Sequence, residues 1–183
     1  NCGNGYEAAR QVSSTYHSEL NETHGGYYAI ENAGQLYWFA DYVNSGNNTV
    51  KAVLTTDIVV NEVLGDDARG WFPIGYYDYR SGEEIYYIGT FDGNNKTISG
   101  LYCNNENENS VGLFGQIGSG AVVKNVGILE SYFRGFTCVG SVCGYSLGGS
   151  ITNCYNTGEV SGRNYIGGVC GGNNNGCIIA DCY

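Results

Sequence analysis

The chain has few basic residues and no cluster of them. Among 183 residues, 8 are Lys or Arg and 18 are Asp or Glu, so the formal net charge is -10. Nucleic-acid binding needs a cationic surface that releases counterions, and anionic lipid repels an acidic chain. The composition therefore excludes both nucleic acid and a lipid surface as expected partners.

Long apolar runs are also missing. None approaches the roughly 20 residues that a membrane-spanning helix needs, and residues 1–5 are not a basic region followed by an apolar one. We therefore expect no membrane insertion in this segment. Any export signal or anchor is expected to lie outside it.

Residues suited to catalysis are scarce. The two histidines are His17 and His24, and both are expected to face solvent. A zinc peptidase would need a helical His-Glu-x-x-His pair, which the sequence lacks, and a triad hydrolase would need a nucleophile elbow between a strand and a helix, which the expected fold of the repeats does not provide. We expect no catalytic residue, no metal site and no cofactor, so this segment is not expected to be an enzyme.

Glycine and tyrosine, in contrast, are abundant, with 30 and 17 residues. This composition favours turns, strands and aromatic surface. Apolar residues at helical spacing occur only near the start, where they predict a helical segment in residues 1–30 and a second helix over Ala33–Asn44. Asn32 and Gln35 form a variant of the capping box at the start of this second helix.

After this helix the apolar pattern becomes that of strands. We expect strands at Val50–Leu54, Ile58–Val60 and Ile85–Phe91, which together with the helix form an α+β cap over residues 31–95. Asp92–Asn95 reads Asp-Gly-Asn-Asn. These residues tolerate the positive φ angles of a tight turn, so a chain reversal is expected there.

From residue 96 onward the sequence repeats. Lys124-Asn125-Val126 aligns with Thr152-Asn153-Cys154 and with Ala180-Asp181-Cys182, a spacing of 28 residues each time. The repeats lack both helical periodicity and a leucine ladder, which excludes helical solenoids and leucine-rich repeats. The prediction is a mainly β fold, a parallel β-helix whose coils span residues 96–183 and pair about 4.8 Å apart. The last repeat is incomplete, so we expect coils to continue beyond Tyr183.

The repeat register predicts which side chains stack inside the coils. The expected stacks are Val123 with Ile151 and Ile179, Val126 with Cys154 and Cys182, and Cys143 with Cys170.

The cysteines admit three interpretations. Eight of them permit a disulfide framework, but thiols that stack in the core can also remain reduced, and we favour reduced, core-stacked thiols. The spacings of Cys138 to Cys143 and of Cys177 to Cys182 fall loosely within metal-ligand range. Strand geometry does not bring four sulfurs together from spacing alone, so zinc is not expected.

Two glycine-rich stretches resemble a known family. Residues 153–162, followed by Ile166–Gly171, resemble the GLUG repeat of bacterial surface proteins, which also occurs in IgA-specific metallopeptidases. The segments around Trp38 and Trp71 are similar to those that precede such repeats. The resemblance covers roughly residues 30–183. It implies a right-handed β-helix with an N-terminal helical cap, on a cell surface, with adhesion as the role often proposed.

Tyrosine is the most suggestive binding feature. Aromatic faces can stack on sugar rings or anchor a protein partner, although strand alternation can instead send one tyrosine of a pair inward to cover the open end of the helix. The candidate binding residues are Tyr76, Tyr77, Tyr79, Tyr86 and Tyr87.

These observations favour an extracellular or cell-surface scaffold or adhesin-type binding module. Its ligand would be a protein or a glycan, and it could self-associate end to end or laterally. One alternative is an accessory region of a larger surface peptidase. Another is a glycan-active enzyme, which the isolated and differently placed coil acids Glu130, Glu159 and Asp181 disfavour.

Overall fold

The computed structural model describes residues 26–78 and 80–183. These residues wind into a parallel β-solenoid of about five turns, and they include one helix, near the start of the described part. The predicted fold class is therefore confirmed. Of the predicted helical segment in residues 1–30, residues 1–25 lie outside the described residues.

Four parallel sheets form the walls of the solenoid. The longest joins, in spatial order, β1 (Tyr27–Ile30), β2 (Lys51–Leu54), β6 (Thr90–Ser99), β10 (Val122–Leu129), β14 (Ser150–Thr152) and β19 (Ile178–Ala180), with β3 (Ile58–Val59) beside β6 and β15 (Tyr155–Asn156) beside β10. The other three have three strands each: β7 (Tyr102–Asn104), β11 (Tyr132–Arg134) and β16 (Glu159–Ser161); β8 (Asn109–Val111), β12 (Thr137–Val139) and β17 (Asn164–Ile166); and β9 (Phe114–Ile117), β13 (Cys143–Leu147) and β18 (Cys170–Asn174). An antiparallel hairpin pairs β4 (Tyr76–Tyr77) with β5 (Glu84–Ile85).

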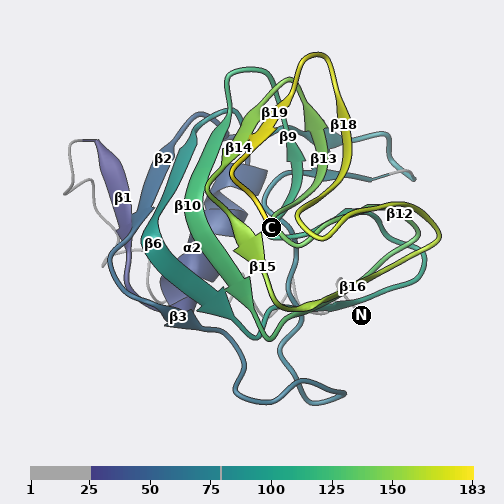
Figure 1. The fold of residues 1–183 in the computed structure, drawn as a ribbon, viewed down its shortest axis with the longest axis horizontal. Helices are drawn as coiled ribbons and strands as arrows, with labels where there is room; N and C mark the ends of the chain where they lie inside the picture. The colour runs from purple at the N-terminus through teal and green to yellow at the C-terminus, as the bar shows by residue number, and fades with distance from the viewer. Residues whose placement is uncertain (1–25, 79) are drawn as a thin grey trace.

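Figure 1 looks along the stack, so that the strands of the longest sheet curve side by side on one side and β12 and β16 lie on the other. Equivalent residues of successive coils pair directly. Val123 pairs with Phe91 on one side and Ile151 on the other, and Ile151 pairs with Ile179. Each inward side chain thus packs on its equivalent in the next coil, which makes one continuous core.

The last coil differs in burial. Val123 and Ile151 are fully buried, whereas Ile179 is 39% exposed, although it pairs with Ile151 as the predicted stack requires. The reason is that, among the described residues, no strand pairs with the far side of β19. Cys170 and Cys182 are half-buried for the same reason.

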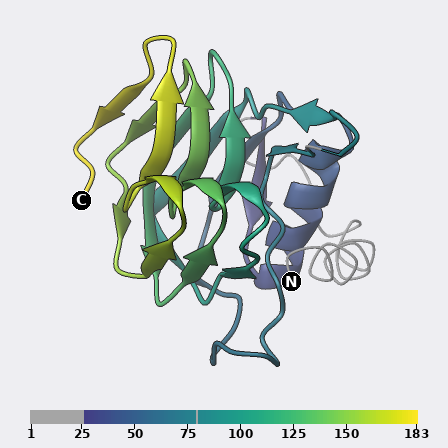
Figure 2. The same ribbon diagram turned by 90° about the vertical axis from the view of Figure 1, so that its right-hand side faces the viewer.

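The helix α2 (Ala33–Asn44) lies across the opposite end of the stack, as Figure 2 shows. Its bounds agree with the prediction. Asn32 Oδ1 accepts a hydrogen bond from the Gln35 backbone N at 3.0 Å. The Gln35 side chain accepts from the backbone N of Glu31 at 2.7 Å, one residue before the N-cap, so the return bond of a capping box is displaced by one residue.

Buried aromatic rings join the helix to the first coils. The Phe114 ring stacks on Tyr87 at 5.1 Å between centroids and meets Phe91 edge-on at 5.3 Å. Phe39 of α2 lies 6.1 Å from Phe91. Trp71, fully buried, donates from Nε1 to the carbonyl oxygen of Gly112 at 3.0 Å. The cap and the coils therefore share one core.

Two expectations for the cap need correction. Residues 27–30, placed in the N-terminal helical segment, form the strand β1, because they pair with residues 51–54 of β2. The expected boundary at residue 95 falls within β6, and β1 and β2 continue the same sheet. The solenoid thus begins earlier in the chain than the repeats do.

The chain reversal expected at Asp92–Asn95 is also wrong. Strand β6 continues through these residues and pairs with β10 on both sides of them, Asp92 with Lys124 and Lys96 with Val126. Asn94 and Asn95 do have positive φ, 50° and 58°. The left-handed residues form a bulge that holds two more residues than β10 has at that point, since three lie between the pairs in β6 and one in β10.

Candidate functional site

The hairpin β4–β5 interrupts the turn of the solenoid that precedes β9. Ile74 and Tyr87, on either side of the hairpin, form parallel bridges with Phe114 and Ile117 of β9. The backbone N of Tyr87 donates to the carbonyl oxygen of Gln116 at 3.0 Å. The hairpin is thereby fixed at the edge of the sheet that β9 and β13 form.

Three tyrosines and one carboxylate meet beside this hairpin, and we call Tyr77, Glu84, Tyr86 and Tyr145 the tyrosine face. Tyr77 and Glu84 pair across the hairpin. Burial and then the Glu84 carboxylate raise the pKa of the Tyr86 phenol, and the phenols of Tyr145 and Tyr77 lie near enough to add to this effect. All three tyrosines are half-buried and Glu84 is exposed, so the group is accessible to a ligand.

Glycines lie directly beside two of these tyrosines. A Cβ at Gly118 would come within 3.1 Å of the Tyr86 Cβ, and one at Gly172 within 3.2 Å of the Tyr145 ring. Gln116 is in register with Tyr145 and is 4% exposed. Within the described part of the chain its Oε1 has no hydrogen-bond partner, so the tyrosine face borders a buried acceptor.

The electrostatics of this region favour neutral phenols. Burial raises the pKa of Tyr86, and the neighbouring Glu84 carboxylate raises it further. Burial also raises the pKa of Tyr76, with added effects from Glu83 and Asp78. At neutral pH the site therefore offers hydroxyl donors and carboxylate acceptors, and it repels anions.

The structure separates the five candidate tyrosines. Tyr77 and Tyr86 belong to the tyrosine face, and the ring of Tyr76 lies 5.7 Å from that of Phe72. Tyr87 is fully buried and donates to the carbonyl oxygen of Val50 at 2.8 Å, so it cannot contact a ligand and its assignment is wrong. Tyr79 lies outside the described residues.

Tyr145 was missed by sequence reasoning. The signal was available in the repeat register, because Tyr145 pairs with Gln116 of the preceding coil and Gly172 of the next. A large aromatic at a position where the neighbouring coils have an amide and a glycine marks an outward, coil-specific side chain. Tyr86 comes near Tyr145 only through the hairpin, and the sequence repeats do not indicate where the hairpin lies.

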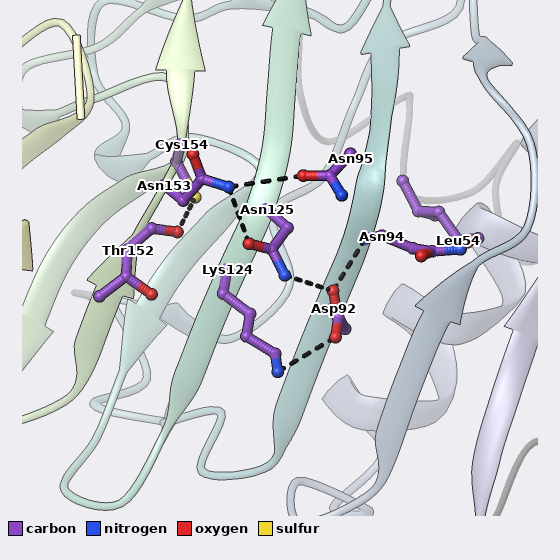
Figure 3. A network of polar contacts seen from close by, with 9 residues as sticks. All are labelled: Leu54, Asp92, Asn94, Asn95, Lys124, Asn125, Thr152, Asn153 and Cys154. Atoms are coloured by element: carbon purple, nitrogen blue, oxygen red, sulfur yellow. Dashed lines mark hydrogen bonds and ion pairs between the residues drawn. The ribbon is translucent and has the colours of Figure 1, made fainter. Parts of the chain in front are cut away.

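A second polar group runs across three coils at the bulge of β6. Figure 3 shows Asn153, Asn125 and Asn95 side by side on neighbouring coils, and each has positive φ, between 51° and 58°. Asn153 Nδ2 donates to Asn125 Oδ1 at 2.9 Å, and Asn125 Nδ2 donates to Asp92 Oδ1 at 3.0 Å. Lys124 Nζ lies 3.1 Å from the other Asp92 oxygen. These side chains bond to one another, which indicates a structural role for this asparagine ladder.

We expect Asn125→Gly to lower the free energy of unfolding by about 1–2 kcal/mol, because it removes the central hydrogen bonds of the ladder while glycine retains the φ of 57°. Asn125→Ala should cost about 1–2 kcal/mol more, since alanine is strained in that conformation. Urea unfolding of both variants measures this. Equal losses would show that the backbone conformation does not matter at this corner.

Asp92 is expected to make the free energy of unfolding depend on pH in the acidic range. Burial raises its pKa, but the hydrogen bonds from Asn125 and Asn94 and the charge of Lys124 outweigh burial, and the net pKa is below the ordinary 3.8. A carboxyl with a depressed folded-state pKa stabilises the fold above its unfolded pKa, and the contribution is lost as pH falls through the folded value.

The free energy of unfolding should therefore fall with acidification below about pH 4, and Asp92→Asn should reduce that slope. Urea titrations between neutral pH and acid measure it. The exposed Asp66 provides the control, because Asp66→Asn should leave the slope unchanged. An unaltered slope in Asp92→Asn would contradict the assignment.

The cysteines are distributed as follows. Cys103 is disulfide-bonded, and six cysteines are free thiols: Cys138, Cys143, Cys154, Cys170, Cys177 and Cys182. Within residues 26–78 and 80–183, no group of three or more His, Cys, Asp or Glu side chains is placed to hold a metal ion. The same residues include no helix of sufficient length and apolarity to cross a membrane.

The coil acids lie at different places. Glu159 pairs with Tyr132 on one wall, Asp181 has a positive φ of 55° at the ladder position, and Glu130 has a φ of 44° after β10. Among the described carboxylates, Asp78 lies near enough to Glu108 to affect its ionisation. Burial raises the pKa of Glu108 and Asp78 raises it further, while Arg80 lowers it.

The comparisons with known proteins agree with the repeat fold described above. Residues 137–161 match the family model described as the GLUG motif. The chain is 39% identical to halomucin of Haloquadratum walsbyi over 95 residues, which are 52% of this chain and 1% of halomucin. It is 29% identical over 127 residues to a Gly-rich membrane protein of Evansella cellulosilytica, covering 69% of this chain and 14% of that protein.

A crystal structure from Bacteroides ovatus, described as an immunoglobulin A1 protease, has a similar fold. The TM-score is 0.57 at 20% identity, and the match covers 88% of this chain and 57% of that one. The chain thus spans a small part of its sequence relatives and about half of its structural neighbour. The predicted resemblance to the GLUG repeat is confirmed by the match of residues 137–161, and this segment lies within the parallel β-solenoid.

Proposed function

We propose that this chain is a non-catalytic binding module displayed outside the cell, and that its ligand contacts the tyrosine face. The observation that carries the proposal is the meeting of Tyr77, Tyr86 and Tyr145 with the Glu84 carboxylate on a half-buried surface. Aromatic rings flanked by hydroxyl donors and carboxylate acceptors suit an uncharged glycan or a protein segment, and the acidic surroundings disfavour anionic ligands.

The surface location is supported by the relatives. One is described as a membrane protein, and the structural neighbour as a protease of immunoglobulin A1, which is an extracellular protein. A solenoid of stacked coils also suits display, because it holds a binding surface on a rigid, extended support.

The experiment is a glycan and matrix-protein array probed with the folded chain and with paired variants. Tyr86→Ala combined with Tyr145→Ala should weaken the binding of any ligand found by about tenfold or more, as loss of aromatic anchors does. The matched control is Tyr102→Ala with Tyr132→Ala, a stacked pair on another wall with 5.6 Å between centroids. Equal losses in both double variants would contradict the site, and an array without any binder would favour a pure scaffold.

A second candidate is an accessory region of a larger surface peptidase. The observation that favours it is the fold shared with the Bacteroides ovatus protein, of which the chain spans 57%. The flanking gene sequence distinguishes the two. A helical His-Glu-x-x-His downstream supports the peptidase, whereas further coils or a wall anchor support the binding module.

End-to-end self-association remains a prediction for the last described coil, which contains β17, β18 and β19. Its apolar side chains include Tyr165, 71% exposed, and Ile178, 59% exposed. Sedimentation of the chain across a concentration series tests it. A species of constant monomer mass at all concentrations would exclude self-association of this segment.

A further inference from the structure

Two pairs of free thiols occupy equivalent positions in successive coils. Cys143 of β13 is in direct register with Cys170 of β18. Cys154 and Cys182 follow the paired residues Thr152 and Ala180 by two positions each, and the backbone N of Tyr183 donates to the Cys154 carbonyl oxygen at 3.2 Å. Paired residues of neighbouring parallel strands lie about 4.8 Å apart, within the range of Cα separations that a disulfide spans.

The thiols of each pair also affect each other's ionisation: after burial, Cys170 raises the pKa of Cys143, and Cys182 adds to the raised pKa of Cys154. The sulfurs donate weak hydrogen bonds to backbone carbonyl oxygens: Cys143 Sγ to Tyr145 O and Cys170 Sγ to Gly172 O, both at 3.3 Å. Thiol hydrogen bonds are weak, so little opposes rotation of either sulfur toward its neighbour.

We propose that Cys143 with Cys170, and Cys154 with Cys182, are sites of two inter-coil disulfides that form when the folded chain meets a small-molecule disulfide such as oxidised glutathione. One protein thiolate attacks the small disulfide, which gives a mixed disulfide and releases one thiol. The second protein thiolate then displaces the other half. The protein loses two hydrogens per bond, and one molecule of small disulfide is reduced to two thiols.

The two members of the first pair have different parts in this exchange. Cys143 is fully buried, whereas Cys170 is half-buried in the last described coil and can be reached first. The hydrogen bond from Cys143 lowers the pKa of Cys170, while burial raises that of Cys143. Cys170 is therefore the attacking thiol and Cys143 the resolving one.

The disulfide at Cys103 supports an oxidising setting for this chain independently of any ligand. Both proposed bonds would join the last coil to the one before it. The bonds would hold β18 and β19 against β13 and β14, whatever ligand the tyrosine face binds.

The test is to incubate the folded chain with oxidised glutathione, quench it with acid, alkylate it and map its peptides. Of the six free thiols, four should become unreactive, which leaves Cys138 and Cys177, and the linked peptides should join Cys143 to Cys170 and Cys154 to Cys182. Backbone amides of β18 and β19 should exchange with deuterium more slowly in the oxidised chain than in the reduced one.

Two variants distinguish the pairing. Cys170→Ser should leave only the Cys154–Cys182 link and three reactive thiols, and Cys138→Ser, the matched control, should keep both links. The proposal is overturned if all six thiols of the wild-type chain stay reactive. It is equally overturned if the main product links Cys138 or Cys177 to another cysteine.

Discussion

Phe114→Ala should lower the free energy of unfolding by about 3–5 kcal/mol, the usual cost of deleting a buried aromatic ring. Phe114 is fully buried and contacts two other rings, Tyr87 at 5.1 Å and Phe91 at 5.3 Å. Its loss leaves a cavity where the helix-bearing end meets the first coil. Phe91 is held in β6 and Tyr87 by its bridge to Ile117, which opposes closure of the cavity.

Denaturant unfolding followed by circular dichroism measures this loss. Phe136→Ala is the matched control, because Phe136 is 38% exposed and has Arg163 at 5.6 Å from its ring. The control should lose less than about 1 kcal/mol. Similar losses in the two variants would contradict the view that the ring junction at Phe114 holds the cap and the coils together.

Gly140→Ala should destabilise the chain by about 1–3 kcal/mol or more, through crowding rather than through a cavity. A Cβ at Gly140 would lie 2.7 Å from the Gly171 backbone N and 2.8 Å from the Cys170 Cα, and closer still to the Cys143 carbonyl oxygen. All three neighbours are backbone atoms. The overlap of the added Cβ with these backbone atoms could be relieved only if the coils moved apart.

The chain provides a matched control for Gly140 in the next coil. A Cβ at Gly168 would meet nothing within 4 Å, so Gly168→Ala should change the free energy of unfolding by less than about 1 kcal/mol, in either direction. Thermal and urea unfolding of both variants measure the difference. Equal stability of the two would show that coil spacing tolerates a methyl group at Gly140.

Much of this fold could be predicted because its determinants are local or repeated. The helix Ala33–Asn44 is marked by an Asn cap and one apolar face, which act within a few residues. The coils are marked by the spacing of residues such as Val123 and Ile151, which pair as the repeat indicates. In both cases the interacting residues can be read from the sequence, either as near neighbours along the chain or as equivalent residues of the next repeat.

The incorrect predictions have the opposite cause, because they concern residues whose conformation depends on contacts distant in the sequence. Residues 27–30 become a strand only because residues 51–54 pair with them, and no sequence repeat indicates that these two segments pair. Asn94 and Asn95 have the positive φ that their type suggests, but a turn and a bulge need the same backbone conformation. The continuing pairing with β10 selects the bulge.

The candidate site was predicted in part for the same reason. Tyr77 and Tyr86 stand out as aromatic residues in an acidic stretch, and the structure leaves both half-buried. Tyr145 joins them from another coil. Its role depends on how the hairpin meets β9 and β13, which is a tertiary contact without a local signal.

The asparagine ladder has a consequence for how such a protein can grow. Asn125 and Asn153, 28 residues apart, repeat the same left-handed corner and bond to each other. A duplicated segment of that length would meet an identical corner below and offer one above, so it could be inserted without disturbing its neighbours. Each duplication would lengthen the molecule by about 4.8 Å, so reach could be adjusted by copy number alone, while an insertion of any other length would have to bulge outward at a turn.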